Sequence, residues 1–315
     1  MTKLSVVVPC FNEEDVLQET YKSLVGSLEK MGLSSFNLIF INDGSSDGTR
    51  EILNNFKILD PRIEVIHFSR NFGHQSAILA GLKKANGDCI AVIDADLQDP
   101  PSVIYDMILE WRKGYKVVYG IREKRKEKLI LRAMYHLYYR FLKKMANIDI
   151  PLDSGDFCLM DKAVVRQLIS MPERNKFIRG LRSWLGYKQI GLKYEREKRF
   201  AGESKYSFIR LLQLGLDGIF SFSMKPLRFV SILGILISII SLFFLVFFII
   251  QRVIGFSIFG VSPANVPGWT SLAIIVLLMG GIQLFTIGLI GEYVGRTYVE
   301  GKNRPEYIVD EDNYV

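Results

Sequence analysis

The chain is organised around residues 89–101, which read Cys89-Ile-Ala-Val-Ile-Asp94-Ala-Asp96-Leu-Gln98-Asp99-Pro100-Pro101. The apolar run 89–93 is typical of a short strand that is buried on both faces, and the proline pair closes the segment. Ligands of open α/β sheets bind beyond the carboxyl ends of the strands. We therefore expect the carboxylates of Asp94 and Asp96 to stand at the binding edge of a sheet.

Asp94 and Asp96 are separated by one alanine, so both carboxylates can turn toward one hard cation. Carboxylate oxygens suit Mg²⁺ or Mn²⁺, which keep open positions for substrate phosphates, and the amide oxygen of Gln98 would add a neutral ligand. The alternative is a polar turn that caps the helix after Pro100-Pro101. The motif predicts a divalent-metal site and, by itself, leaves that alternative open.

Strand-like and helix-like segments alternate through the first part of the chain. This alternation predicts an α/β fold with a doubly wound, mostly parallel sheet. The expected strands are residues 4–8, 36–41, 63–68, 89–93 and 115–119, and a helix is expected over 102–113. Neither G-x-G-x-x-G nor a P-loop follows any of these strands, so dinucleotide-binding and ATPase functions lack their phosphate cradle.

Cysteine and histidine are too scattered to build a disulfide framework or a zinc site. The 315 residues include 3 cysteines and 3 histidines. Cys10, Cys89 and Cys158 sit in apolar runs, which suits a reduced compartment and excludes a disulfide framework. The histidines supply no zinc ligand set.

Two uncharged apolar segments, 229–250 and 269–290, are each long enough to cross a hydrocarbon core of roughly 30 Å. We expect two transmembrane helices there, the alternative being buried helices of a soluble core, and small residues in both would permit a homo-oligomer. Basic residues flank the pair on its outer sides, at Lys225, Arg228, Arg296, Lys302 and Arg304. Between the segments only Arg252 is basic. The positive-inside rule then predicts a multi-pass protein of the cell inner or plasma membrane, with the N-terminal α/β domain and both termini in the cytosol.

Residues 124–146 combine a basic face with apolar positions spaced by three and four. Such a helix is expected to lie in the membrane interface and contact lipids, although packing on the sheet would also explain its apolar side. A second amphipathic helix is expected over 206–228. The net charge of +7 is assigned to a membrane surface and not to nucleic acid, because the basic clusters flank apolar helices instead of interleaving with exposed aromatics.

Three motifs occur in order along the chain: residues 6–14, Val-Val-Val-Pro-Cys-Phe-Asn-Glu-Glu; residues 42–49, Asn-Asp-Gly-Ser-Ser-Asp-Gly-Thr; and residues 94–101. On these motifs the sequence resembles glycosyltransferase family 2. Within that family it is similar to the polyisoprenyl-phosphate glycosyltransferases, namely the dolichol-phosphate mannose synthases and, more closely, the GtrB-type bactoprenol glucosyltransferases. The resemblance runs from about Leu4 to the C-terminus and implies a GT-A-type, Rossmann-like catalytic domain.

The resemblance implies which residues bind the nucleotide sugar: Pro9, Phe11, Glu13, Asp43, Arg70, Asp94, Ala95 and Asp96. Pro9, Phe11 and Glu13 would line the uridine, and Asp43 would accept hydrogen bonds from the base. The structural alternatives are a simple turn at residues 42–44 and a helix N-terminal charge at Glu13. Arg70 would contact a phosphate or a base edge, or form one half of a structural ion pair.

The resemblance also implies anion-binding and catalytic residues. Arg122, at the predicted end of a strand, matches a position that neutralises the departing nucleotide or holds an acceptor phosphate. Asp156, with Asp153 second, matches an acid on the acceptor side that would act as general base or orient the substrate. Catalytic roles would fall to Asp156, Asp96 and Arg122. Acceptor and phosphate contacts would fall to Arg122, Arg132, Arg199, Ser204 and Lys205, of which Arg199, Ser204 and Lys205 resemble the family's R-x-x-G-x-S-K signature. The structural alternatives are a surface arginine, a turn carboxylate and a juxtamembrane basic anchor.

The sequence therefore predicts an inverting, metal-dependent glycosyltransferase of the EC 2.4 class. It would move a hexose, with glucose expected, from a UDP-sugar to a polyprenyl phosphate at the cytosolic membrane face. The expected parts are a catalytic domain (1–205), a juxtamembrane helix (206–228), two transmembrane helices (within 229–295) and a cytosolic tail (296–315). One rival is a processive polysaccharide synthase, which would carry a Q-x-x-R-W motif and more spans. The other is a non-catalytic nucleotide-sugar-binding membrane protein, which the intact Asp94 and Asp96 pair disfavours.

Overall fold

The computed structural model of the chain describes residues 2–123, 154–173, 176–195 and 268–310, together with single positions between 227 and 250. The chain divides into two compact units, one made of Met1–Gly218 with Asn303–Val315 and the other of Ile219–Lys302. Several predicted features lie outside the described residues: the interfacial helix 124–146, the juxtamembrane helix 206–228, most of 229–250, and Arg132, Asp153, Arg199, Ser204 and Lys205.

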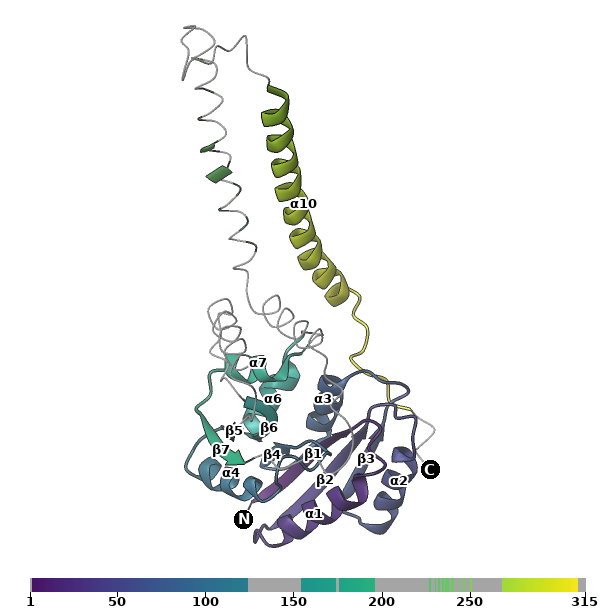
Figure 1. Cartoon of the computed structure of the whole chain (residues 1–315). Helices are drawn as coiled ribbons and strands as arrows, with labels where there is room; N and C mark the ends of the chain where they lie inside the picture. Colours follow the sequence, from purple (N-terminus) through teal and green to yellow (C-terminus); the bar gives the residue numbers. More distant parts are fainter. Residues whose placement is uncertain are drawn as a thin grey trace. The chain divides into compact units, whose positions relative to one another are not determined.

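Strands and helices alternate in the first unit from its start (Figure 1). In chain order they are β1 (Lys3–Cys10), α1 (Leu17–Glu29), β2 (Ser35–Asn42), α2 (Thr49–Leu59), β3 (Ile63–His67), α3 (His74–Lys84), β4 (Cys89–Val92), α4 (Val103–Arg112), β5 (Val117–Glu123), β6 (Ser154–Asp161), α6 (Lys162–Ser170), α7 (Ile178–Trp184) and β7 (Gln189–Glu195). The predicted α/β alternation is thus confirmed.

Seven strands of the described chain form one sheet in the order β3-β2-β1-β4-β6-β5-β7. Four neighbouring pairs are parallel, whereas β6 runs antiparallel to both β4 and β5. The mostly parallel sheet is confirmed, with one reversed strand that the sequence did not indicate. Val92 of β4 pairs with Cys158 of β6. Continued by two residues, this register brings Asp156 level with Asp94 at the carboxyl edge of β4.

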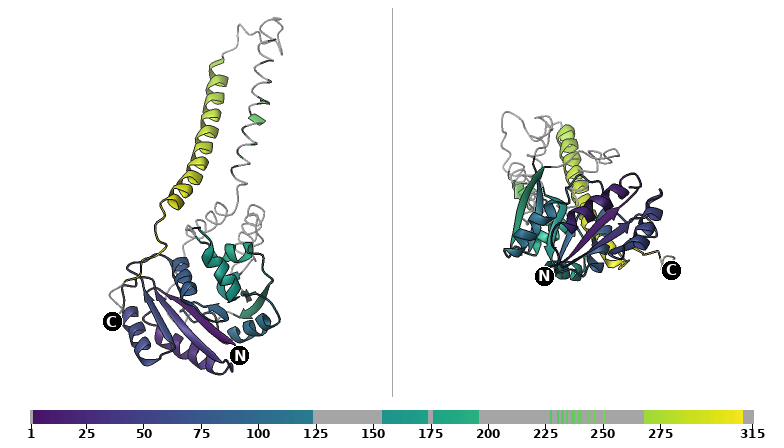
Figure 2. Two further views of the ribbon diagram at one scale, coloured as in Figure 1. Left: turned by 180° about the vertical axis from the view of Figure 1, so that it is seen from behind. Right: turned by 90° about the horizontal axis from the view of Figure 1, so that it is seen from below.

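The sheet is covered by helices on both faces, and this explains the apolar run Val6-Val7-Val8 in β1. Val6 and Val8 pack in one core with α1, α2 and α4, whereas Val7 packs in a second core with α3, α6 and α7. Figures 1 and 2 show these two helix layers on opposite sides of the strands. A strand that is buried on both faces is usually a near-continuous run of apolar residues, as is common in parallel sheets.

The prediction that the fifth strand ends at residue 119 was wrong. β5 continues to Glu123, across a register shift between Tyr119 and Ile121, because its last residues pair in parallel with β7. Arg122 therefore lies inside the strand, one residue before its end, and pairs with Tyr194. It still stands at the carboxyl end of β5, as expected.

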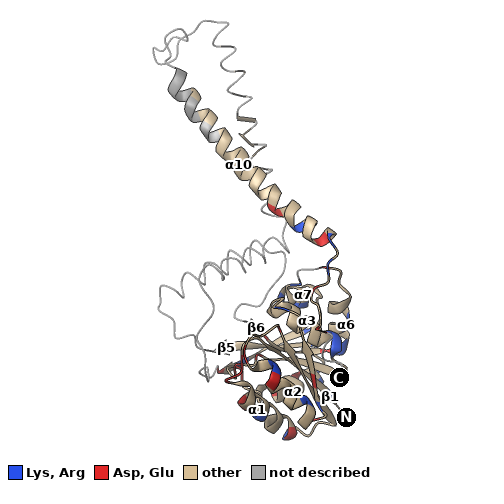
Figure 3. Ribbon diagram, turned by 90° about the vertical axis from the view of Figure 1, so that its right-hand side faces the viewer, with Lys and Arg blue, Asp and Glu red and all other residues tan. Residues whose placement is uncertain are grey.

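The second unit contains α10 (Gly268–Gly301), a helix of 34 residues. Charged residues colour the α10 ribbon only toward its C-terminal end in Figure 3. In the sequence these are Glu292, Arg296 and Glu300. Several apolar side chains of α10 are exposed, among them Leu284, Phe285 and Ile287. No helix in the described ranges is both long and apolar enough to cross a membrane.

Candidate active site

The turn after β4 presents the two acids of the central motif. Asp94 follows the strand by two residues and is partly exposed, while Asp96 is buried. The backbone N–H of Gln98 donates to Asp96 Oδ1 over 3.2 Å, and the hydroxyl of Thr20 donates to the carbonyl of Ala95 over 2.6 Å. Leu97 has a φ of 56°, a left-handed conformation that branched side chains rarely adopt. Backbone strain of this kind is concentrated at functional sites.

Asp156, near the start of the reversed strand β6, faces Asp94 across a histidine. His74 Nε2 lies 3.3 Å from Asp156 Oδ2 and 3.7 Å from Asp94 Oδ1. His74 is the first residue of α3, and Gly73 before it has a φ of 98°. A glycine is needed at that position because an L side chain would be strained there. The imidazole thus bridges the acid from β4 and the acid from β6.

Arg179 of α7 fixes the other side of Asp156. Its Nε and one terminal nitrogen donate to the two carboxylate oxygens over 2.7 and 2.8 Å, a bidentate pair. Gln75 of α3 lies 3.5 Å from Asp156 Oδ2 and accepts from the backbone N–H of Ile178 over 3.1 Å. Side chains from α3 and α7 therefore converge on one carboxylate, which is only 7% exposed.

These contacts set the charges of the cluster. Burial alone would raise the pKa of Asp156, but Arg179 and His74 outweigh it and hold that pKa well below its ordinary value. Burial would lower the pKa of His74, yet Asp156 and Asp94 raise it to about 9. Removal from water raises the pKa of Asp94, with His74 opposing the shift. At neutral pH the cluster thus holds an ionised Asp156 between two cations.

The two N-terminal motifs, which follow β1 and β2, are tied together by hydrogen bonds. The Asn12 N–H donates to Ser45 Oγ over 2.9 Å, and the Glu13 N–H donates to Thr49 Oγ1 over 2.9 Å. In return, the Gly48 N–H donates to a Glu14 carboxylate oxygen over 2.6 Å. The loops that were expected to bind uridine therefore form one structure at the carboxyl edge of the sheet.

Asp43 is buried at the centre of these loops. Its carboxylate accepts the backbone N–H groups of Phe72, over 2.7 Å, and of Gly73, over 2.9 Å. Burial raises the pKa of Asp43, although both hydrogen bonds lower it. The resemblance predicted that the Asp43 carboxylate accepts hydrogen bonds from the nucleotide base. In the structure, part of its capacity to accept hydrogen bonds is used by the backbone that leads into α3.

The remaining predicted residues are placed as follows. Pro9 lies in β1 opposite Ile41, and Phe11 beyond the strand is 38% exposed. Arg70 stacks on Phe72, with its guanidinium carbon 4.2 Å from the ring centroid, and donates to the Asn71 carbonyl over 3.0 Å. The predicted role of Arg70 as a phosphate or base-edge contact stays a prediction.

Sequence reasoning missed His74 and Arg179, which hold Asp156. His74 was considered only as a zinc ligand. Its position at the start of the helix that follows β3, directly after Gly73, was a usable signal, because such positions lie at the carboxyl edge of the sheet. Arg179 lies in a helix of seven residues with no motif around it, and only the fold brings it to the site.

The donor chemistry of Asp94, Asp96 and Gln98 fits a hard divalent cation, because all three offer oxygen ligands. Within the described ranges, no group of three or more His, Cys, Asp and Glu side chains is placed to hold a metal ion. The metal site stays a prediction.

Comparison with known proteins identifies the family. The family model for glycosyl transferase family 2 matches residues 5–169. The chain belongs to this family. It is 47% identical over 306 residues, 97% of this chain and 92% of the relative, to the uncharacterized glycosyltransferase YkcC of Bacillus subtilis (strain 168). It is 40% identical over 308 residues, 98% of both chains, to the prophage bactoprenol glucosyl transferase homolog of Escherichia coli (strain K12).

These full-length similarities confirm the resemblance of this family 2 glycosyltransferase to the bactoprenol glucosyl transferases. Among solved structures, a mannosyltransferase from Pyrobaculum calidifontis in complex with GDP-Man and Mn²⁺ matches with a TM-score of 0.48 and 16% identity, over 72% of this chain and 64% of that chain. That likeness is too slight to support an argument about function.

Proposed function

We propose that this glycosyltransferase moves a hexose, most simply glucose, from a UDP-sugar to a polyprenyl phosphate with inversion at the anomeric carbon. The observation that carries the proposal is the meeting of Asp94 and Asp156 across His74 at the carboxyl edge of the sheet. These contacts support a site in which Asp94 would serve the donor and Asp156 the acceptor. The similarity over nearly the whole chain to a protein named for bactoprenol supports a lipid acceptor.

The donor would be bound by the loops after β1 and β2 and by the turn after β4. Asp94, Asp96 and Gln98 would hold a Mg²⁺ or Mn²⁺ ion, which when bound supplies positive charge for the departing diphosphate. Phe11 offers a partly exposed ring on which a uracil can stack. Asp43 would shape the base pocket while it is held by the Phe72 and Gly73 N–H groups.

Asp156 would orient the reactants and not remove a proton. Arg179 and His74 hold the pKa of Asp156 well below its ordinary value, and so weak a base accepts a proton poorly at neutral pH. A phosphate acceptor is already anionic and needs no general base. One of its oxygens would bond to the anomeric carbon as the bond from that carbon to the UDP oxygen breaks. Arg122, at the end of β5, would contact one of the phosphates.

We further propose that the reaction takes place at the cytosolic face of the cell membrane. The uncharged segments 229–250 and 269–290 and the Lys and Arg residues on their outer sides support this arrangement. The basic, amphipathic sequence of residues 124–146 would collect the anionic lipid head.

The test is to incubate membranes from cells that express the full chain with a panel of radiolabelled nucleotide sugars and polyprenyl phosphate. We expect label from UDP-glucose to enter the organic phase as a lipid-linked monosaccharide. Asp96→Asn removes one anionic oxygen ligand at unchanged size and should abolish the transfer, and chelation of divalent ions in the wild-type reaction should do the same. Label that accumulates in a polymer would indicate the processive synthase, and binding of UDP without any labelled product would indicate a non-catalytic protein.

A further inference from the structure

The segment Asn303–Asp310, which follows α10 in the sequence, packs on the catalytic unit and belongs to it. Val309 forms an antiparallel bridge with Phe68. The Ser69 N–H donates to the Ile308 carbonyl over 3.0 Å, and the Asp310 N–H donates to the His67 carbonyl over 2.9 Å. The segment therefore covers the end of β3, the outermost strand on that side of the sheet.

Aromatic contacts seat this segment beside the donor loops. The ring of Tyr307 stacks on Phe68 with centroids 4.8 Å apart, and Phe68 meets Phe72 edge to face at 5.8 Å. Phe72 in turn supplies one of the backbone N–H groups that hold Asp43. An ion pair between Arg50 and Asp310, 2.8 Å long, fixes the end of the segment. Its position is thus determined by packing, hydrogen bonds and charge together.

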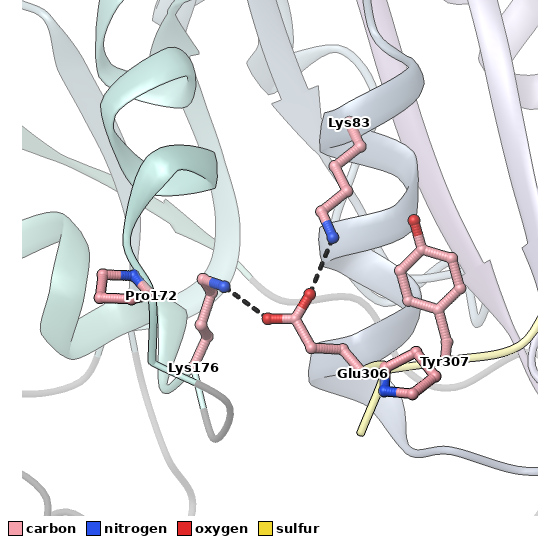
Figure 4. A pocket seen from close by; sticks show the side chains of 6 residues that line it. Lys83, Pro172, Lys176, Glu306 and Tyr307 are labelled. Carbon is pink, nitrogen blue, oxygen red and sulfur yellow. Dashed lines mark hydrogen bonds and ion pairs between the residues drawn. The ribbon is translucent and has the colours of Figure 1, made fainter. Parts of the chain in front are cut away.

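Glu306 connects two parts of the unit that are far apart in sequence. One carboxylate oxygen accepts from Lys83 of α3 over 2.8 Å, and the other accepts from Lys176, two residues before α7 (Figure 4). These three residues, with Pro172, Pro305 and Tyr307, line an open pocket of about 440 Å³. Lys176 is only 7% exposed, so Glu306 is the counter-charge for a buried ammonium group.

Glu306 joins α3 to the residues that lead into α7, and α3 and α7 are the two helices that hold Asp156. α3 carries His74 and Gln75, and α7 carries Arg179. A second tie between them, from the Ile178 N–H to Gln75, lies directly at the site. Glu306 adds a tie at the other end of α3, since Lys83 lies nine residues beyond His74, about 13 Å along the helix. Two ties restrain the distance and the angle between α3 and α7, which one tie cannot do.

We propose that Glu306 is a positioning residue for Asp156: seated by the segment Asn303–Asp310, it holds α3 and the start of α7 in the arrangement in which His74 and Arg179 converge on that carboxylate. Glu306 does not touch the reacting groups. Its effect on turnover rests on the proposed glycosyl transfer, whereas its effect on the structure does not.

The test compares Glu306→Gln with the wild type as full-length protein. Glu110→Gln is the matched control, because it breaks another lysine–glutamate pair, between Glu110 of α4 and Lys113 just after that helix. In Glu306→Gln we expect kcat with UDP-glucose and polyprenyl phosphate to fall about tenfold, with the KM for UDP-glucose changed less than about twofold. The control should match the wild type in both. Glu306→Asp keeps the charge and should recover part of kcat, and it replaces Glu306→Gln if that variant does not fold.

A double variant separates positioning from simple stability. Glu306→Gln leaves the buried Lys176 without its counter-charge, and adding Lys176→Met removes that charge. We expect the double variant to regain the wild-type melting temperature but to keep the low kcat, because the link between α3 and α7 is still missing. Recovery of both quantities would overturn the proposal, as would a folded Glu306→Gln enzyme with wild-type kcat.

Amide hydrogen exchange without any substrate provides a readout that does not depend on the proposed function. Peptides covering residues 72–78 and 176–184 should exchange faster in Glu306→Gln than in the wild type, and at wild-type rates in Glu110→Gln. If no nucleotide sugar is turned over, the proposed function fails while this comparison still decides the inference. Unchanged exchange in both peptides would refute it.

Discussion

His67, at the end of β3, is held between two amide side chains. Its Nδ1 lies 3.1 Å from the Asn42 amide nitrogen, and its Nε2 lies 2.9 Å from the Asn54 amide oxygen. Both contacts are hydrogen bonds only in the neutral ring with the proton on Nε2, because an imidazolium would point a second N–H at the amide donor of Asn42. Burial, followed by the nearby charge of Arg50, lowers the pKa of His67 from 6.5 to about 4.

The stability of the folded chain should therefore decrease as the pH falls from 6.5 to about 4. In this range the unfolded chain binds a proton at His67 that the folded chain does not, so acid favours unfolding, by at most about 3 kcal/mol. Thermal unfolding at several pH values, in the wild type and in His67→Gln, measures the effect. The variant cannot titrate at this position and should lose less stability on acidification. Equal pH dependence in both proteins would contradict the assignment.

The site residues divide into those with a sequence signal and those without one. Asp94 and Asp96 were predictable because a buried apolar run ends in them, and Asp156 because it matches a family position. The partners that set the charge of Asp156 were not predictable in the same way. His74 and Arg179 reach it from two helices whose approach depends on the packing of the second core, and no short pattern encodes such a contact.

At the scale of elements, β6 explains why the parallel part of the sheet could be predicted and the antiparallel part could not. The strands up to β4 are each followed by a helix, and this alternation indicates parallel pairing. β6 carries the same kind of apolar residues, with Phe157 and Leu159 in one core and Cys158 and Met160 in the other. A strand that is buried on both faces has the same apolar pattern whether it runs parallel or antiparallel to its neighbours. The sequence therefore does not indicate that β6 is reversed. That reversal is what places Asp156 beside Asp94.

α7 serves to present Arg179 to Asp156, and this gives a prediction for the helix. Arg179→Met should reduce kcat about ten- to a hundredfold, because it removes charge-assisted hydrogen bonds of about 1.5–3 kcal/mol. It also removes the main cation that lowers the pKa of Asp156, so the acid limb of the pH–rate profile should move to higher pH. Arg166→Met, at an exposed position of the neighbouring helix α6, is the control and should leave both unchanged. Equal losses in the two variants would show general destabilisation.

At the scale of the whole molecule, the sequence predicted an α/β catalytic part followed by a largely apolar part. The hydropathy of residues 269–290 indicates a helix, and α10 covers that range. The return of Asn303–Asp310 to the catalytic unit was not predictable, because the contacts of Glu306 and Asp310 join residues more than 100 positions apart. From the sequence alone, a short polar segment after a long helix is interpreted as a solvated tail, because only the fold shows which residues it contacts.

The proposed orientation in the membrane can be tested by labelling single introduced cysteines with a membrane-impermeant maleimide. The native thiols Cys10, Cys89 and Cys158 are buried and should give little background. Ser262→Cys lies between the two uncharged segments and should react in intact cells, because basic residues are concentrated outside that pair of segments and favour the cytosol. Lys30→Cys, at the exposed end of α1, should react only after the membrane is permeabilised. Labelling of both positions in intact cells, or of neither before permeabilisation, would contradict two crossings with a cytosolic catalytic domain.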